Sequence, residues 1–363
     1  MQITKLGYQK LGLNSRDLKY KSDPNFFDQF LSFYPTLDGL KEAVLSRKDF
    51  PVNRQLIFDA ISSQYHSIDA SATVQNNIQA LKNNSTYTIT TAHQPSLFTG
   101  PLYFIYKAFS CINLAKRMKE EMPEINFVPI FVLGSEDHDF DEVNHFTIFG
   151  KKITWDNNLG GPVGRYNLTD LDKVLEQAKE ILGADSKASH ILLKIEEFLD
   201  KSNSYNQFNI MFLNYLFGNY GLVVVNMDNF AFKKAFIPIL EKEIFEEVSF
   251  NLVKQTQDKL SSLGFEPQAH AREINVFYLG AHSRERIVKN GDVYEILNTN
   301  LIFTAEELRN ELHTNPQNFS PNVILRPIYQ EYTLPNIAYV GGGGELAYWM
   351  ERKTQFQYFN VFY

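Results

Sequence analysis

The chain has 363 residues, 44% of them hydrophobic and 21% charged, which is typical of a folded globular protein and unlike a disordered one. Its formal net charge of −7 argues against nucleic acid as the main partner, because binding to phosphates needs a basic surface. A single cysteine, Cys111, excludes a disulfide within the chain, and no apolar run has the length of a signal peptide core or a membrane span, so we expect a soluble cytoplasmic protein without a membrane partner.

The N-terminal part, residues 1–82, is expected to be mostly helical and to pack on the rest of the chain. Ser22 or Asp23 can cap a helix that carries a proline in its first turn, and the stretch 71–84 (SATVQNNIQALKNN) has apolar residues at helical spacing. We therefore expect the central domain to span residues 83–363.

The clearest pattern begins at residue 87, where a strand, a loop, a long helix and a second strand follow one another. The segment 87–91 (YTITT) is β-rich, 102–122 has helical periodicity, and 126–134 (NFVPIFVLG) is almost entirely apolar. Connections of this length are typical of parallel strands in a Rossmann-like α/β fold. Because ligands bind beyond the carboxyl ends of such strands, the loops after both strands should form one site.

In the rest of the chain we expect further strands and helices of this α/β core, separated by β-rich insertions. Short β runs broken by Asn and Gly predict insertions at about 145–168 and 265–300. A third core strand is expected at 222–228, followed by a helical stretch interrupted or entered at Pro238. The segment 320–356 should run strand, loop, strand, glycine turn and helix, and the aromatic end of the chain resembles the start of another buried strand.

The loop 92–101 (AHQPSLFTGP) is the first candidate site. Thr99, Gly100 and Pro101 are expected to open the long helix, and the free N–H groups of a helix start attract anions. His93 can then donate to a phosphate or to a developing negative charge. A structural histidine, with Thr99 as helix N-cap, explains the same residues equally well.

The acidic stretch 134–145 (GSEDHDFDEVNH) is the second candidate site. Its carboxylates suit Mg²⁺ and its mixed His and Asp residues suit Zn²⁺, Mn²⁺ or Fe, yet the spacing matches no familiar metal motif. Asp141 is expected to cap a helix whose first turn includes Glu142. The carboxylates nearer the strand would repel one another without a cation, so an ammonium or a sugar amine is as reasonable a ligand as a metal.

The third candidate site lies near the end of the chain. Arg326, Gln330 and Glu331 share an apolar segment, and the run from Gly341 to Gly344 leads into a helix. The glycines offer backbone N–H groups without forming a phosphate-binding P-loop, and close packing or ligand approach would explain their number better than a flexible turn.

Together these three blocks resemble the signature segments of the BshC family of cysteine ligases, which act last in bacillithiol synthesis, and the resemblance spans nearly the whole chain. It implies a Rossmann-like core of the nucleotidyltransferase type with connecting insertions. It also implies a reaction in which L-cysteine is joined to the amine of glucosaminyl malate. How cysteine is activated stays open, with a nucleotide such as ATP, together with Mg²⁺, as the expected cofactor. Family members also have a C-terminal coiled coil that supports dimers; it is absent from this chain, for which we expect reduced stability and no such dimer.

Carried onto this sequence, the resemblance implies two sets of residues. The expected catalytic residues are His93, Glu136, Asp137, His138 and Asp139. The expected substrate- or nucleotide-binding residues are Gln94, Thr99, Gly100, Arg326, Gln330, Glu331, Gly341, Gly342, Gly344 and Glu345. Two alternatives remain: a metal-dependent hydrolase that uses Asp137, His138, Asp139 and His145, and a non-catalytic nucleotide-binding protein.

Overall fold

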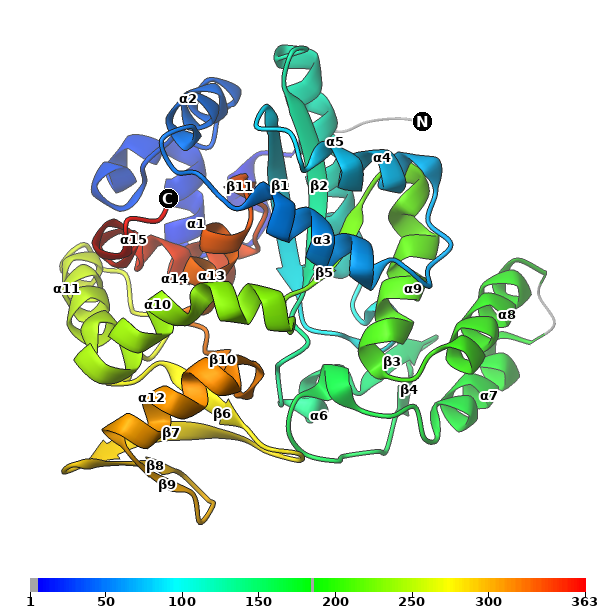
Figure 1. The fold of residues 1–363 in the computed structure, drawn as a ribbon. Coiled ribbons are helices and arrows are strands. Elements are labelled where there is room, and N and C mark those ends of the chain that lie inside the picture. Colours follow the sequence, from blue (N-terminus) through cyan, green and yellow to red (C-terminus); the bar gives the residue numbers. More distant parts are fainter. Residues whose placement is uncertain (1–5, 184–185) are drawn as a thin grey trace.

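The computed structural model describes residues 6–183 and 186–363, so the first five residues of the segment predicted to be helical lie outside it. At its centre is a parallel sheet with the strand order β11–β1–β2–β5 (Figure 1). The strands are β1 (Thr86–His93), β2 (Asn126–Leu133), β5 (Val223–Asn226) and β11 (Asn336–Tyr339). This arrangement confirms the predicted α/β class with a parallel sheet.

The strands β1 and β2 are buried along almost their whole length, which explains their apolar and β-branched sequences. The long helix α5 (Tyr103–Glu121) connects them and packs against both. Its buried face includes Ala108 and Cys111, and the Cys111 thiol donates to the carbonyl oxygen of Ile89 at 2.9 Å. The parallel register pairs His93 with Leu133, so both strands end at the same level.

Helices from both halves of the chain surround this sheet. Helix α2 (Leu37–Arg47) packs against β11, and α4 (Ala72–Ala80) and α9 (Tyr205–Phe217) pack against β5. The N-terminal part also contains α1 (Ser15–Ser22), a 3-10 helix (Pro24–Phe30) and α3 (Arg54–Gln64). Within residues 6–183 and 186–363, no helix combines the length and apolar character needed to cross a bilayer.

Side chains close both edges of the parallel sheet. On β5, the amide of Gln64 donates to the carbonyl oxygen of Val224 at 2.6 Å and accepts from the N–H of Asn226 at 2.8 Å. The hydroxyl oxygen of Tyr65 accepts from the N–H of Val224 at 2.8 Å. On β11, Nε of Arg47 donates to the carbonyl oxygen of Asn336 at 3.1 Å. Backbone groups that another strand would otherwise pair are therefore satisfied within the chain.

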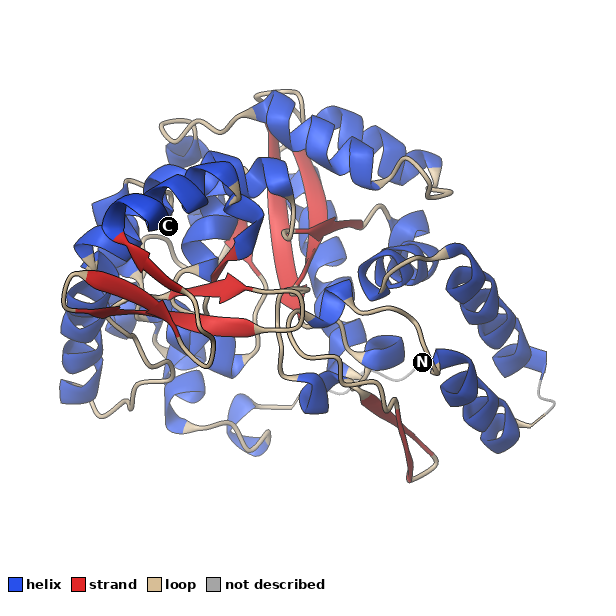
Figure 2. Cartoon of the chain, turned by 60° about the horizontal axis from the view of Figure 1, so that its bottom comes forward, coloured by secondary structure: helices blue, strands red, loops and turns tan. Residues whose placement is uncertain are grey.

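Two groups of antiparallel strands lie beyond the carboxyl ends of β1 and β2, on either side of those ends (Figures 1 and 2). One is the hairpin of β3 (His145–Ile148) and β4 (Lys151–Thr154), which packs with α7 (Leu171–Leu182); α8 (Ser186–Lys201) lies against α7 in turn. The other is a sheet ordered β10–β6–β7–β8–β9, with α12 (Ala305–Thr314) beside it. Its strands are β6 (Val276–Leu279), β7 (Arg284–Asn290), β8 (Val293–Ile296), β9 (Ile302–Thr304) and β10 (Phe319–Pro321).

Three local predictions are wrong. Helix α10 (Phe230–Glu246) runs through Pro238 and ends where Glu247 adopts a left-handed conformation, before α11 (Val248–Ser262). Between β10 and β11 the chain forms α13 (Arg326–Thr333), with a proline in its first turn where proline is tolerated. After α14 (Gly343–Met350), the aromatic end forms α15 (Lys353–Phe359) instead of a strand, because a helix also buries Phe356 and Phe359.

The closure of the β5 edge by Gln64 can be tested by replacing Gln64 with alanine. We expect Gln64→Ala to lower the free energy of unfolding by about 2 kcal/mol, because one carbonyl and one N–H of β5 lose their partner. Urea denaturation followed by circular dichroism measures the change. Gln55→Ala is the matched control, since Gln55 is an exposed glutamine of the same helix. Equal stability of both variants would show that the side chain does not support the edge.

Candidate functional site

A cavity with a volume of about 970 Å³ lies at the carboxyl ends of the central strands. It brings together residues from all three predicted blocks. The loops after β1 and β2 contribute His93, Gln94, Glu136, Asp137, His138 and Asp139. The C-terminal blocks contribute Arg326, Gln330, Gly342, Gly344 and Glu345. Residues more than 200 positions apart in sequence thus share one cavity, as the predicted parallel sheet requires.

Thr99 and Gly100 are not among the residues that line this cavity. Helix α5 begins at Tyr103 after Leu102, which forms no side-chain cap, so the predicted N-cap role of Thr99 is wrong. A Cβ atom on Gly100 would lie 2.8 Å from Cβ of Ser96, and its backbone has a positive φ of 58°. Close packing and backbone conformation therefore explain this glycine without a bound anion.

Glu331 lines a different, mostly apolar cavity of about 360 Å³. Its Oε1 accepts hydrogen bonds from Nε2 of Gln330 at 2.9 Å and Nδ2 of Asn336 at 2.8 Å. Burial raises the pKa of Glu331 to about 7, against the lowering effect of these bonds and of Arg47. Glu331 therefore contacts Gln330 but faces a different cavity, because α13 is a helix and places neighbouring residues on different faces.

The carboxylate of Glu345 forms hydrogen bonds that hold the glycine turn in place. The Glu345 carboxylate accepts from the N–H of Gly342 at 2.8 Å, from Nζ of Lys107 at 2.6 Å and from the hydroxyl of Tyr339. Gly341 packs instead against Tyr339, whose ring would lie 3.0 Å from an added Cβ, and does not line the cavity. Lys107 also donates to the carbonyl oxygen of Ala92 and so joins this turn to the end of β1.

The environment of His93 determines which ring nitrogen carries the proton. Nδ1 lies 3.1 Å from the carbonyl oxygen of Gln94, which can only accept, so Nδ1 is the donor. Nε2 lies 3.1 Å from the hydroxyl of Tyr103 and accepts from it. Burial lowers the pKa of His93 and favours this neutral form. The neutral ring has no N–H left for a phosphate, so the predicted donor role, which stays a prediction, would require the protonated ring.

Asp137 of the acidic stretch accepts hydrogen bonds from three groups. It accepts from Nε2 of Gln94 at 2.8 Å and from the N–H groups of His138 and Asp139. Burial alone would raise the pKa of Asp137, but the His138 side chain, Arg284, Gln94 and the N–H of Asp139 hold it well below its usual range. Asp137 is therefore an anion with little affinity for a proton.

Helix α6 (Phe140–Val143) follows directly, with Asp139 at its N-cap. The Asp139 side chain forms no capping bond, and the predicted cap by Asp141 is wrong because Asp141 already lies in the first turn. Glu142 of the same turn accepts from Nε2 of Gln94 at 2.8 Å. Gln94, the residue after β1, thus contacts two carboxylates of the acidic stretch, Asp137 and Glu142.

Asp137, His138 and Asp139 offer possible metal-ligand atoms within 4.8 Å of one another. However, Nη1 of Arg284 lies 3.1 Å from Nδ1 of His138 and can only donate to it, so this nitrogen lacks a free lone pair for a metal. Neither oxygen of Asp137 lacks an N–H partner. His145 contacts Asn144 and does not line the cavity. The geometry therefore favours N–H partners over a metal at this cluster.

Three arginines from the antiparallel sheet and the loop before it form a basic wall that the sequence interpretation missed. Arg272, Arg284 and Arg286 line the cavity. Arg284 is held by Ser320 and by the carbonyl oxygen of Pro321, both at 3.1 Å. Nε of Arg286 is buried and has no partner among the described residues. Arg284 and Arg286 are two positions apart on β7, which places them on one face of the strand. This spacing in the sequence could have predicted that both arginines lie on the same side of the sheet.

Glu136, the first carboxylate after β2, pairs with the buried Lys233 of α10. Burial raises the pKa of Glu136, Lys233 lowers it, and Asp228 raises it again, with a net increase. Glu136 also lines the cavity, so it differs from Asp137 in being a carboxylate with an increased affinity for a proton.

The chain is similar to known proteins over its whole length. The family model described as "Bacillithiol biosynthesis BshC, N-terminal Rossmann-like domain" matches residues 1–363. A Flavobacterium psychrophilum protein named "Putative cysteine ligase BshC" is 40% identical over 361 residues, which cover 98% of this chain and 67% of that protein. Proteins of the same name from Cytophaga hutchinsonii and Bacillus cereus are 38% and 30% identical, over 98% of this chain and 67% and 68% of their own lengths.

The buried carboxyl of Glu331 predicts a pH-dependent stability. The pKa of Glu331 is about 7 in the folded chain, above the ordinary value of 4.5. As the pH rises, the unfolded chain therefore loses this proton before the folded chain does. The free energy of unfolding falls between about pH 4.5 and pH 7 as a result. Glu331→Gln retains the acceptor for Gln330 and Asn336 and removes the charge. We expect its free energy of unfolding to exceed that of the natural chain by up to ~3 kcal/mol at pH 8 and to match it near pH 4.5.

Denaturant unfolding at a series of pH values measures this difference. Glu124→Gln is the control, because Glu124 is exposed and outside both cavities. A difference between Glu331→Gln and the natural chain that is constant with pH would contradict the expectation.

Proposed function

The chain belongs to the BshC family, and from this membership we propose that it is a cysteine ligase of bacillithiol biosynthesis. The named relatives support this activity, because they match 98% of the chain. In the proposed reaction the carboxyl group of L-cysteine forms an amide bond with the amine of glucosaminyl malate. Both substrates combine an amine with carboxylates, and this combination is the property that the cavity has to recognise.

The observation that carries the proposal is the opposite charge of two walls of the cavity. Asp137 and Asp139 follow β2 on one side, and Arg272 and Arg286 belong to the other. Carboxylates attract an amine, whereas guanidinium groups bind carboxylates through charge-assisted hydrogen bonds. The malate carboxylates fit the arginine wall, and the sugar amine then lies toward the acidic wall.

Amide formation also needs a proton acceptor. As the amine nitrogen attacks the activated carboxyl carbon, a C–N bond forms, the bond to the leaving oxygen breaks, and the nitrogen loses a proton. We assign the proton to Glu136, since burial raises its pKa, whereas the pKa of Asp137 is too low for this role. Negative charge on the attacked oxygen is placed near Arg326, a partly buried arginine that lines the cavity and donates to Tyr348 at 2.7 Å.

Activation of the cysteine carboxylate requires a co-substrate, for which we propose a nucleoside triphosphate with Mg²⁺. It would convert one carboxylate oxygen into a leaving group. The cationic side chains of the cavity suit its phosphates, whereas Thr99 and Gly100, predicted for this role, lie outside the lining.

The proposal is tested by incubating the protein with ATP, L-cysteine and glucosaminyl malate and measuring the thiol product by mass spectrometry. We expect product formation that depends on the protein. Arg286→Met should raise KM for glucosaminyl malate about 10- to 100-fold with a smaller change in kcat, because one charge-assisted contact with a carboxylate is lost. Arg117→Met, at an exposed arginine on α5, is the control.

Two outcomes would contradict the proposal. Protein that binds the substrates without forming product would support a binding role only. A stoichiometric, tightly bound transition metal together with hydrolysis of the substrate would support the metal-dependent hydrolase built on Asp137, His138 and Asp139.

A further inference from the structure

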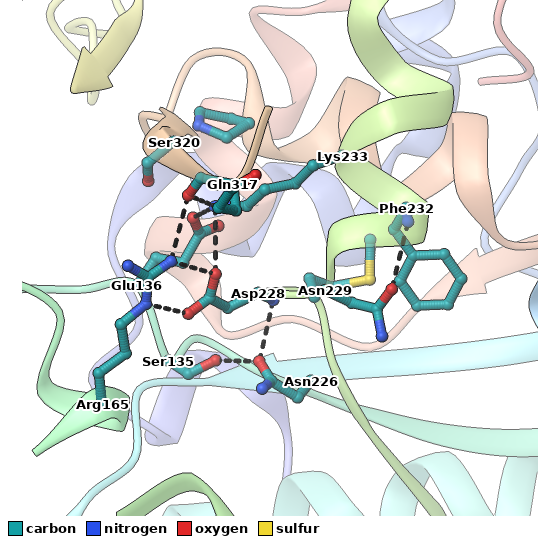
Figure 3. A network of polar contacts seen from close by, with 12 residues as sticks. Ser135, Glu136, Arg165, Asn226, Asp228, Asn229, Phe232, Lys233, Gln317 and Ser320 are labelled. Carbon is teal, nitrogen blue, oxygen red and sulfur yellow. Dashed lines mark hydrogen bonds and ion pairs between the residues drawn. The ribbon is translucent and has the colours of Figure 1, made fainter. Parts of the chain in front are cut away.

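Lys233 is a fully buried lysine directly behind the acidic wall, with 1% of its surface exposed. Its ammonium forms ion pairs with Glu136 and, at 3.1 Å, with Oδ1 of Asp228, and it donates to the carbonyl oxygen of Gln317 at 3.1 Å (Figure 3). An ammonium group has three N–H donors, so each can have its own acceptor. Lys233 does not line the cavity, whereas Glu136 and Asp228 do.

A second cation, Arg165, joins this network from the surface, with 37% of its side chain exposed. Arg165 donates from Nε to Oδ2 of Asp228 at 2.6 Å and from Nη2 to Oδ1 at 2.8 Å. It also donates to the carbonyl oxygen of Gln317 at 3.1 Å. Two cations thus balance two carboxylates, and this balance offsets much of the cost of removing the charges from water.

The network joins segments that are distant in sequence. Glu136 follows β2, Asp228 follows β5, and Lys233 lies in the first turn of α10. Near the same strand ends, the Ser135 hydroxyl donates to Oδ1 of Asn226, which also accepts from the N–H of Asp228. The position of the Glu136 carboxylate is therefore set by α10 and β5 as well as by its own strand.

From these contacts we infer that Lys233 is a positioning residue that holds the Glu136 carboxylate, as an anion, at the wall of the cavity. Arg165 acts one step further away, because it holds Asp228, which in turn contacts Lys233. The inference rests on the proposed function for the role of Glu136 as proton acceptor. The placement of Glu136 by Lys233 can be tested without that role.

Without Lys233, Asp228 would keep Arg165 as its partner, whereas Glu136 would lose its ion pair and have the nearby charge of Arg284 to balance it. Repulsion and lost solvation would then displace or protonate Glu136. A proton acceptor acts in the chemical step, so its loss lowers kcat far more than it raises KM. A lysine that only stabilised the fold would not produce this selective effect.

The first arm of the test measures placement by amide hydrogen exchange with mass spectrometry. Compared with the natural chain, Lys233→Met should exchange at least 10-fold faster in the segments 134–139 and 226–229. Lys234→Met should not, because Lys234 is the exposed neighbour on the same helix. Unchanged exchange in Lys233→Met would overturn the inference, whether or not the protein makes the product. If the natural chain makes no product, the proposed function fails and this arm alone decides the placement.

The second arm uses turnover and a double-mutant cycle. Lys233→Met should lower kcat about 100-fold with KM changed less than threefold, and Lys233→Arg, which keeps the charge, should recover part of it. If Lys233 acts through Glu136, adding Lys233→Met to Glu136→Gln costs no further activity. Losses that multiply in the double variant would show an independent role and overturn the inference. Thermal unfolding identifies a variant that fails to fold, in which case Lys233→Arg and Arg165→Gln carry both arms.

Discussion

The parallel pairing of β1 with β2 is the constraint on which the rest of the structure depends. Its register is continuous from Thr86 and Asn126 to His93 and Leu133, so two loops separated by a whole helix leave the sheet side by side. The neighbouring strands extend the same edge. Pairing of β11 with β1 brings the glycine turn to the cavity, and pairing of β5 with β2 brings Asp228 to its wall.

The loops that meet at the cavity carry many charged side chains. These side chains are paired to different degrees, depending on how deeply they are buried. Lys233, behind the cavity, and Asp228, at its wall, form an ion pair and are almost fully buried. At the wall itself the pairing is incomplete, since Nε of Arg286 lacks a partner among the described residues and Asp139 forms no capping bond. Arg286 and Asp139 both line the cavity, and the paired groups hold the wall in place.

The sequence was informative where local patterns decide the structure. The periodicity of β1, α5 and β2 and the position of polar residues after each strand predicted the sheet and the two loops that meet at the cavity. Arg286, Lys107 and Lys233 were missed because each sits in an ordinary strand or helix, and only tertiary contacts bring it to the site. The helix α13 was missed for a related reason: a proline and several β-rich residues suggested an extended chain, whereas burial of Ile328 and Tyr329 favours a helix.

The side chains that close the two edges of the sheet have a consequence for synthesis of the chain. Gln64 and Arg47 both precede every strand in the sequence, so they are synthesised first. The side chain of Gln64 can therefore pair with β5 as soon as Asn226 is made. The partner of β1 on the other side, β11, is made last, more than 200 residues after β1 itself. Until then the growing chain exposes an unpaired edge of β1 on which other chains can add. During this interval the nascent protein is most susceptible to aggregation and has most need of a chaperone.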